Sequence, residues 1–137
     1  MKPNNISIDN YYKNVPIVKF PNDEKIIILK IHLNIKKHPV KQCIKIEWRM
    51  DFEKASDCRY VFGVNEGIIE EIYELKNISI STNGTNRKIL HVIPVNNKLR
   101  NKYVGNLIPI FFRQRRHTYP VRYNFYLKNG ITIFYKY

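Results

Sequence analysis

The sequence predicts a β-rich α+β fold, either a small barrel or a strongly bent, mostly antiparallel sheet with one or two short helices. Short runs of alternating apolar and polar residues recur along the chain, turn signals separate them, and only two segments carry helical caps or spacing. The length of 137 residues suits one domain with one core. We expect residues 1–25, which are polar and contain three prolines, to form an irregular N-terminal arm, and residues 26–137 to form the single domain.

Two early segments have the period of a half-buried strand. Apolar and polar side chains alternate in LKIHLNIK (29–36) and in VKQCIKIEWRM (40–50). The dipeptide His38-Pro39 between them is a turn signal. The two segments are therefore predicted to be strands.

Two other segments are predicted to be short helices. Residues 51–58 (DFEKASDC) begin with Asp51, a suitable N-cap for one or two helical turns. In 97–108 (NNKLRNKYVGNL) a helix is expected to start at Asn97 and to end near Gly105, because glycine readily terminates a helix.

The centre of the chain contains further strand candidates. Residues 59–64 (RYVFGV) and 68–75 (IIEEIYEL) flank the tight turn Asn65-Glu66-Gly67, which predicts a hairpin. Residues 77–81 (NISIS) and 87–95 (RKILHVIPV) are two more strand candidates, separated by a polar loop.

The clearest hairpin is the last one. The segments YNFYLK and ITIFYKY flank Asn129-Gly130, the pair typical of a type I′ turn. This turn predicts that Phe125 opposes Phe134 and that Tyr126 opposes Ile133. Its outer strand is an edge that another protein chain can extend, so a protein partner at this hairpin is one expectation.

Charge is segregated along the chain. Residues 1–74 hold 12 Lys and Arg against all 11 Asp and Glu, a net charge of +1. Residues 75–137 hold 12 Lys and Arg, no Asp or Glu and six of the eight arginines, a net charge of +12. A basic half-domain of this kind is typical of a protein that binds a polyanion.

Cysteine usage and hydropathy bear on the compartment. Cys43 and Cys58 form no CxxC pair, so the sequence predicts no zinc site, and we expect neither metal nor other cofactor. Both cysteines are expected to be buried thiols in a reducing compartment, which favours a cytoplasmic protein. No signal peptide is visible and no stretch approaches ~18 apolar residues, so no membrane association is expected.

Two blocks carry a family resemblance, WRMDFEKASDCRYVFGVNEGIIEEIYEL (48–75) and LRNKYVGNLIPIFFRQRRHTYPVRY (99–123). Together they resemble a group of small, poorly characterised bacterial and phage proteins and domains. The shared pattern is a Trp, a Tyr-Val-Phe-x-Val strand, a Gly-Ile-Ile strand, and then Tyr-Val-Gly-x-x-Ile-Pro. The chain departs from that pattern at Thr118-Tyr119-Pro120, where the group usually has Asn before Pro. The strand order is similar to that of small PUA-like barrels, which bind RNA or modified DNA, and this analogy implies nucleic-acid binding.

Enzymatic chemistry has two sets of candidate residues. The carboxylates follow no strand in a metal-nuclease pattern, and we expect them to cap helices or to face solvent; they are Asp51, Glu53, Asp57, Glu66, Glu70 and Glu74. His117 is flanked by arginines, and His91 is a second general acid or base if the fold brings the two together. A metal-independent, toxin-like ribonuclease is therefore the enzymatic alternative.

Binding without chemistry is the leading hypothesis. The segment RQRRH (113–117) supplies guanidinium groups that bind phosphate in a bidentate manner, and interleaved tyrosines such as Tyr126 stack on unpaired bases. The predicted nucleic-acid-binding residues are Arg87, Lys88, Lys98, Arg100, Lys102, Arg113, Arg115, Arg116, His117, Tyr119, Arg122 and Tyr123. RNA is the preferred ligand, and opened or modified DNA is the alternative. Two further alternatives fit the same composition. The protein is a structural or interaction protein of a phage or viral assembly, or it is an inhibitor of an acidic protein.

Overall fold

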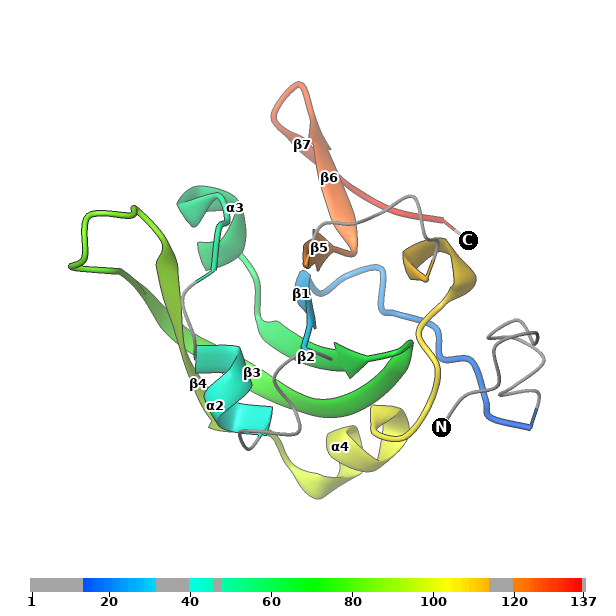
Figure 1. The fold of residues 1–137 in the computed structure, drawn as a ribbon. Helices are drawn as coiled ribbons and strands as arrows, with labels where there is room; N and C mark the ends of the chain where they lie inside the picture. The colour runs from blue at the N-terminus through cyan, green and yellow to red at the C-terminus, as the bar shows by residue number, and fades with distance from the viewer. Residues whose placement is uncertain (1–13, 32–39, 46–47, 114–119, 137) are drawn as a thin grey trace, which may run out of the picture.

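A computed structural model describes residues 14–31, 40–45, 48–113 and 120–136 of the chain. Within these residues the molecule is an α+β structure rich in strands (Figure 1). The strands are β1 (Ile26–Lys30), β2 (Tyr60–Asn65), β3 (Ile68–Ile80), β4 (Lys88–Pro94), β5 (Val121–Tyr123), β6 (Phe125–Lys128) and β7 (Ile131–Phe134). The helical elements are α2 (Val40–Lys45), α3 (Phe52–Ser56), α4 (Asn97–Tyr103) and the 3-10 turn η1 (Ile110–Phe112).

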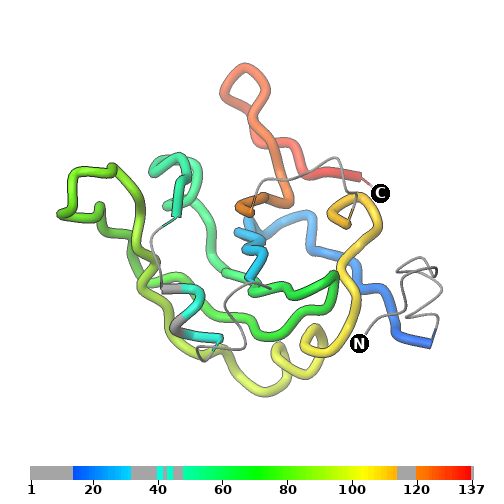
Figure 2. Tube along the Cα trace, viewed as in Figure 1, coloured from blue at the N-terminus to red at the C-terminus, as the bar shows by residue number. Residues whose placement is uncertain are grey.

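The main sheet has the order β4-β3-β2-β1-β5, and β6 with β7 forms a separate two-stranded sheet. Only β1 and β2 pair in parallel, whereas the other pairs described are antiparallel. The sheet is strongly bent and remains open rather than closing into a barrel, as the tube through the long β3–β4 ribbon shows (Figure 2). The predicted fold class is confirmed in its bent-sheet form.

Strand β1 begins earlier than predicted and is buried on both faces. It starts at Ile26, whereas the predicted strand was 29–36, of which residues 32–36 lie outside the described residues. Residues 26–29 are all buried because apolar side chains cover both faces of the sheet here. A strand with two covered faces shows a continuous apolar run, so the alternation rule placed it too late.

The prediction of a strand over residues 40–50 is wrong, because residues 40–45 form helix α2. Cys43 and Ile44 are consecutive and both fully buried, which helical spacing with Val40 allows and a strand with one buried face does not. The helix lies close to β2, where a Cβ on Gly63 would come within 3.2 Å of Ile31 Cδ1 and Ile44 Cδ1. Glycine at this position therefore permits the close approach of α2 to the sheet.

Strand β3 is one long element instead of the two strands predicted for 68–75 and 77–81. It bends at two irregularities in its pairing, beside Gly63/Val64 of β2 and between its own Leu75 and Asn77. A β-bulge turns the strand while the flanking residues stay paired, so the sheet curves without a break.

The predicted helices and tight turns are confirmed. The carboxylate of Asp51 accepts hydrogen bonds from the backbone nitrogens of Glu53 and Lys54 at the start of α3. The helix α4 begins at Asn97, with Asn96 as its N-cap, and the chain leaves it through Gly105 at φ +88°.

The last hairpin has the predicted register. Phe125 opposes Phe134, and Tyr126 opposes Ile133. Asn129 and Gly130 both have positive φ, at 51° and 78°, which is the type I′ geometry.

The core lies on both faces of the sheet. One cluster combines β1 and β2 with α2, α3 and Phe125, and the second combines the opposite face with α4 and η1. The lead-in contributes Phe20 to the second cluster, and Val18 donates a backbone hydrogen bond to Leu107 O at 2.9 Å. Residues 14–25 are thus anchored on the core by backbone and side-chain contacts.

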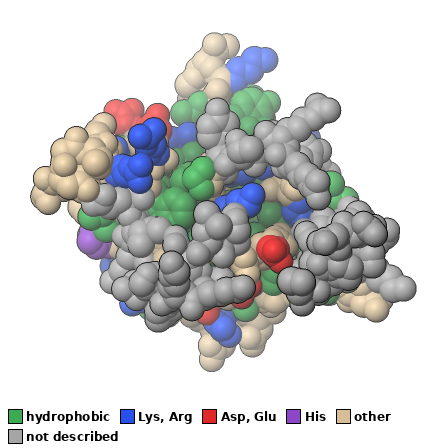
Figure 3. All heavy atoms as spheres, in the orientation of Figure 1, with side chains coloured by type: hydrophobic (Ala, Val, Ile, Leu, Met, Phe, Trp, Pro, Cys, Tyr) green, Lys and Arg blue, Asp and Glu red, His purple; other side chains and the backbone are tan. Residues whose placement is uncertain are grey.

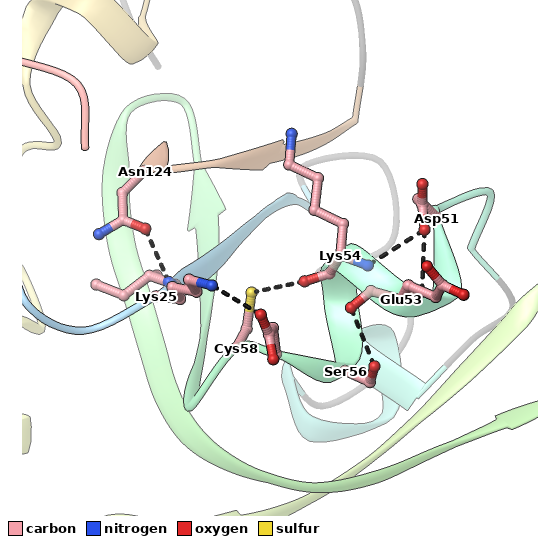
Figure 4. A network of polar contacts seen from close by, with 9 residues as sticks. Lys25, Asp51, Glu53, Lys54, Ser56, Cys58 and Asn124 are labelled. Atoms are coloured by element: carbon pink, nitrogen blue, oxygen red, sulfur yellow. Dashed lines mark hydrogen bonds and ion pairs between the residues drawn. The ribbon is translucent and has the colours of Figure 1, made fainter. Parts of the chain in front are cut away.

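Strands β5 and β6 belong to different sheets, and the chain passes from one sheet to the other at Asn124. Asn124 is only 2% exposed. Its side-chain Oδ1 accepts from Ile26 N at 2.8 Å, and its Nδ2 donates to the carbonyl oxygens of Glu24 at 2.9 Å and Pro21 at 3.2 Å. Figure 4 shows Asn124 directed at the start of β1. This side chain therefore joins the lead-in, the central strand and the C-terminal hairpin.

Replacement of Asn124 by alanine should lower the free energy of unfolding by about 2–4 kcal/mol, because it removes the partners of one buried and two part-buried backbone groups. Chemical denaturation measures the loss. The control is Asn77→Ala on exposed β3 backbone, which should change stability by less than about 0.5 kcal/mol. Equal effects of the two substitutions would show that Asn124 holds no special place in the fold.

Candidate nucleic-acid interface

The aromatic side chains of the last hairpin form one connected group with η1. The ring centroid of Tyr135 lies 5.0 Å from that of Tyr126 and 4.8 Å from that of Phe111. Phe111 in turn lies 5.0 Å from Phe112, which is buried in the second core cluster. Aromatic pairs at these distances stabilise one another, so the base of the projecting hairpin is fixed to the body of the molecule.

An open hollow of ≈ 690 Å³ lies against this hairpin and is lined by Tyr126, Ile133, Phe134, Tyr135 and Lys136. Tyr126 and Ile133 are paired across the strands, so their side chains lie on one face. Both tyrosines are half-buried, which holds their rings while leaving part of each exposed. The hollow therefore combines aromatic surface with one ammonium group, a composition suited to a planar ring that carries a nearby negative charge.

The surroundings of the hollow are basic. Lys128 at the hairpin tip and Lys136 at its base are both exposed, and the chain has no acidic residue after Glu74. In the space-filling view, the projecting hairpin shows basic and hydrophobic side chains, whereas acidic side chains lie on other parts of that face (Figure 3). The two aspartates that flank α3 are occupied, Asp51 in capping the helix and Asp57 in an ion pair with Lys25 at 2.7 Å.

Two of the predicted arginines lie next to this aromatic group. The guanidinium carbon of Arg122 is 5.8 Å from the ring centroid of Phe112, which lies 6.1 Å from that of Tyr135. Arg113 follows η1 directly and donates from Nε to Ile108 O at 2.8 Å. The structure thus brings both residues to the base of the hairpin.

Tyr123, another predicted contact, lies on the opposite face of the sheet. It pairs with Ile27 and packs against the first core cluster, and its ring is covered by Lys54 Nζ at 4.5 Å. Burial raises the pKa of its hydroxyl above the ordinary value. Its ring is therefore a packing element and is not positioned to stack on a base.

Other predicted contacts are distant from the hairpin or already occupied. Figure 1 shows α4 at the opposite end of the molecule from the projecting hairpin, and the tip of the β3–β4 ribbon to one side, beyond α3. Lys88 is 5% exposed and donates to Asn86 O at 2.6 Å. Arg100 binds Glu71 through three hydrogen bonds, which raises the pKa of its guanidinium. Arg87, Lys98 and Lys102 are half-buried or exposed in this second region, where Lys102 Nζ lies 5.3 Å from the ring of Tyr103.

The remaining predicted residues, Arg115, Arg116, His117 and Tyr119, lie outside the described residues. His91, the second histidine of the ribonuclease hypothesis, lies on β4 with Nε2 at 2.8 Å from Ser79 Oγ. Neither ring contacts nor hydrogen bonds among the described residues link it to the hairpin.

Four of the five lining residues were absent from the predicted ligand contacts: Ile133 and Phe134, which were predicted only as strand partners, and Tyr135 and Lys136, which were not named. The signal for Tyr135 was present in the Asn129-Gly130 turn, which fixes the register. Once Tyr126 opposes Ile133, Tyr135 is its diagonal neighbour and within reach of its ring. The contact between Tyr135 and η1 is tertiary and has no local sequence signal.

Metal and membrane features are also defined by the described residues. They contain no group of three or more His, Cys, Asp or Glu side chains arranged to hold a metal ion. No helix in the same part of the chain is both long and apolar enough to span a membrane.

Comparison of the chain with protein-family models, with curated proteins and with solved structures finds no match. The function therefore has to be argued from the residues of this chain.

The two cysteines are buried thiols, as the sequence predicts, and no disulfide joins them. Burial raises the pKa of the Cys58 thiol to about 12, while the nearby Lys25 lowers it by a smaller amount. Because the thiolate is the reactive form, this cysteine is a packing residue and is not an activated nucleophile.

Stability should fall as the pH rises from about 9 to about 12, because the Cys58 thiol ionises near its ordinary pKa only in the unfolded chain. Unfolding then releases a proton, at a cost in stability of up to about 1.4 kcal/mol per pH unit. Chemical denaturation at several pH values in this range measures the effect. The free energy of unfolding should fall less steeply with pH in Cys58→Ala than in the unchanged protein. An identical slope in the two proteins would contradict the assigned burial of the thiol.

Replacement of Tyr123 by phenylalanine should raise the free energy of unfolding by about 1 kcal/mol. The hydroxyl oxygen of Tyr123 is buried and has no hydrogen-bond partner among the described residues, so its removal eliminates a desolvated polar group. Thermal denaturation measures the gain, and Tyr126→Phe on the exposed face is the control with little expected change. A loss of stability in Tyr123→Phe would show that the hydroxyl is satisfied in solution.

Proposed function

We propose that this protein binds nucleic acid with unpaired bases, RNA by preference or an opened or modified strand in DNA, at the face of the last hairpin that carries Tyr126 and Tyr135. The observation that supports this most is the hollow in which two partly exposed tyrosine rings stand beside Lys136. It belongs to a half of the chain with a net charge of +12 and no carboxylate side chain.

The tyrosines supply binding that tolerates different sequences. Every base has an aromatic face, and stacking on a protein ring contributes about 1–3 kcal/mol per base. The ring of Tyr135 is supported by Phe111 and Phe112, so it loses little conformational freedom when a ligand stacks against it. Unpaired bases are accessible in RNA loops and in opened DNA, whereas stacked base pairs hide these faces.

The cations supply the attraction for phosphate. Lys128 and Lys136 lie at the two ends of the hairpin face, and Arg122 lies beside Phe112 at its base. Glu71 on β3 and Asp57 after α3 are already paired with Arg100 and Lys25. Three phosphate contacts correspond to a slope of about −2 in the logarithm of affinity against the logarithm of salt concentration for a single strand.

Replacement of Tyr126 by alanine should weaken the binding of a short single-stranded RNA by roughly 5- to 150-fold, the equivalent of one lost stacking contact. Fluorescence anisotropy at low salt measures the affinity. Tyr126→Phe keeps the ring and should bind within about twofold of the unchanged protein. Thermal denaturation of each variant separates a loss of binding from a loss of fold.

Three results would contradict the proposal. The first is equal affinity of the alanine and phenylalanine variants. The second is cleavage of the RNA by the purified protein with and without magnesium, which would favour the ribonuclease hypothesis. The third is a single co-purifying protein that resists nuclease treatment, which would favour a protein partner at the exposed hairpin edge.

A further inference from the structure

Arg122 occupies an unusual position for a charged side chain. It lies on the edge strand β5 opposite Ile28 of β1, so its side chain emerges on the face of the second core cluster. There it meets the ring of Phe112 with its guanidinium carbon 5.8 Å from the centroid. The side chain is half-buried, and its Nη1 atom is fully buried.

No hydrogen-bond acceptor for this buried Nη1 is present among the described residues. Two other arginines of the chain contrast with it. Arg59 binds Glu24 at 2.7 Å and Arg100 binds Glu71 at 2.8 Å, and in each case the carboxylate raises the pKa of the guanidinium. For Arg122 burial lowers the pKa, and the hydroxyl of Tyr135 acts weakly in the opposite direction.

A guanidinium with one buried nitrogen and no acceptor for it among the described residues is costly, because the protein interior solvates a charge less well than water does. The ring of Phe112 offsets only part of that cost, since it lies near the outer limit of a cation–π contact. Charged groups that destabilise the fold in this way are common at functional sites, where a bound ligand supplies the missing hydrogen-bond acceptor.

We infer that Arg122 forms an anion site at the base of the last hairpin and takes a phosphate group there. The planar guanidinium can donate to two phosphate oxygens at once. Residues 75–137, which include Arg122, contain no Asp or Glu that would compete with phosphate for it. The position continues the aromatic face, because Phe112 connects Arg122 to Tyr135 through ring contacts. The inference rests on the proposed function in one respect, since a nucleic-acid strand that stacks on Tyr135 supplies such a phosphate.

The test compares thermal stability in inorganic phosphate and in chloride at the same ionic strength. At about ten times the dissociation constant, phosphate should raise the Tm of the unchanged protein by about 3–6 °C. Arg122→Met keeps the aliphatic length and removes the charge. This variant should show a higher Tm than the unchanged protein in chloride, by a few °C, and no phosphate-specific rise. Arg122→Lys should keep part of the rise, and Arg59→Met, which removes an arginine paired with Glu24, should keep all of it.

The inference is overturned if phosphate raises the Tm of Arg122→Met and of the unchanged protein equally, or raises neither. It is also overturned if Arg122→Met loses several °C in chloride, because the guanidinium would then be a structural partner of the fold.

A second arm uses a short single-stranded oligonucleotide and distinguishes the source of the phosphate. If the group belongs to a strand, inorganic phosphate competes with the oligonucleotide and Arg122→Met reduces the salt slope by about 1. If the oligonucleotide does not bind while phosphate still stabilises the protein through Arg122, the proposed function is wrong. The anion site is then retained, and its ligand is a free phosphate or a phosphorylated small molecule. Binding of the oligonucleotide that is independent of Arg122, without stabilisation by phosphate, refutes the anion site alone.

Discussion

The C-terminal hairpin is held in place by the buried side chain of Asn124. Three hydrogen bonds connect it to the backbone at Pro21, Glu24 and Ile26, about a hundred residues earlier in the chain. At this residue the chain leaves the main sheet and begins the projecting hairpin, so Asn124 sets the direction in which the hairpin points. The aromatic face with Tyr126 and the edge strand with Arg122 start on either side of it, and both depend on the same junction.

The parts of the fold that the sequence predicts correctly are those with local causes. Asp51 caps α3 through its own carboxylate, and Asn129-Gly130 adopts the positive φ values of a type I′ turn. That turn fixes the register of the last hairpin, so the facing of Tyr126 was available from sequence alone. The segregation of charge is likewise a property of the chain and needs no structure.

The parts that the sequence misplaces have tertiary causes. Residues 40–45 alternate like a strand but form a helix, because Gly63 lets them pack against the sheet with Cys43 and Ile44 both buried. By composition the basic residues near α4 are equivalent to those of the hairpin, yet Arg100 is neutralised by Glu71, whose position depends on the bend of β3. Ion pairs between residues distant in sequence decide which basic side chains are available to a ligand. Neither the alternation of residues nor the composition predicts these ion pairs.

The most direct test of the account is a titration of the tyrosine ring resonances with a single-stranded RNA of about eight nucleotides at low salt. We expect the signals of Tyr126 and Tyr135 to shift together and to saturate, while those of the buried Tyr103 and of the half-buried Tyr123, whose ring Lys54 covers, stay unchanged. Shifts centred on Tyr103 at the end of α4, or no shift in any tyrosine, would contradict the claim that the last hairpin is the nucleic-acid interface.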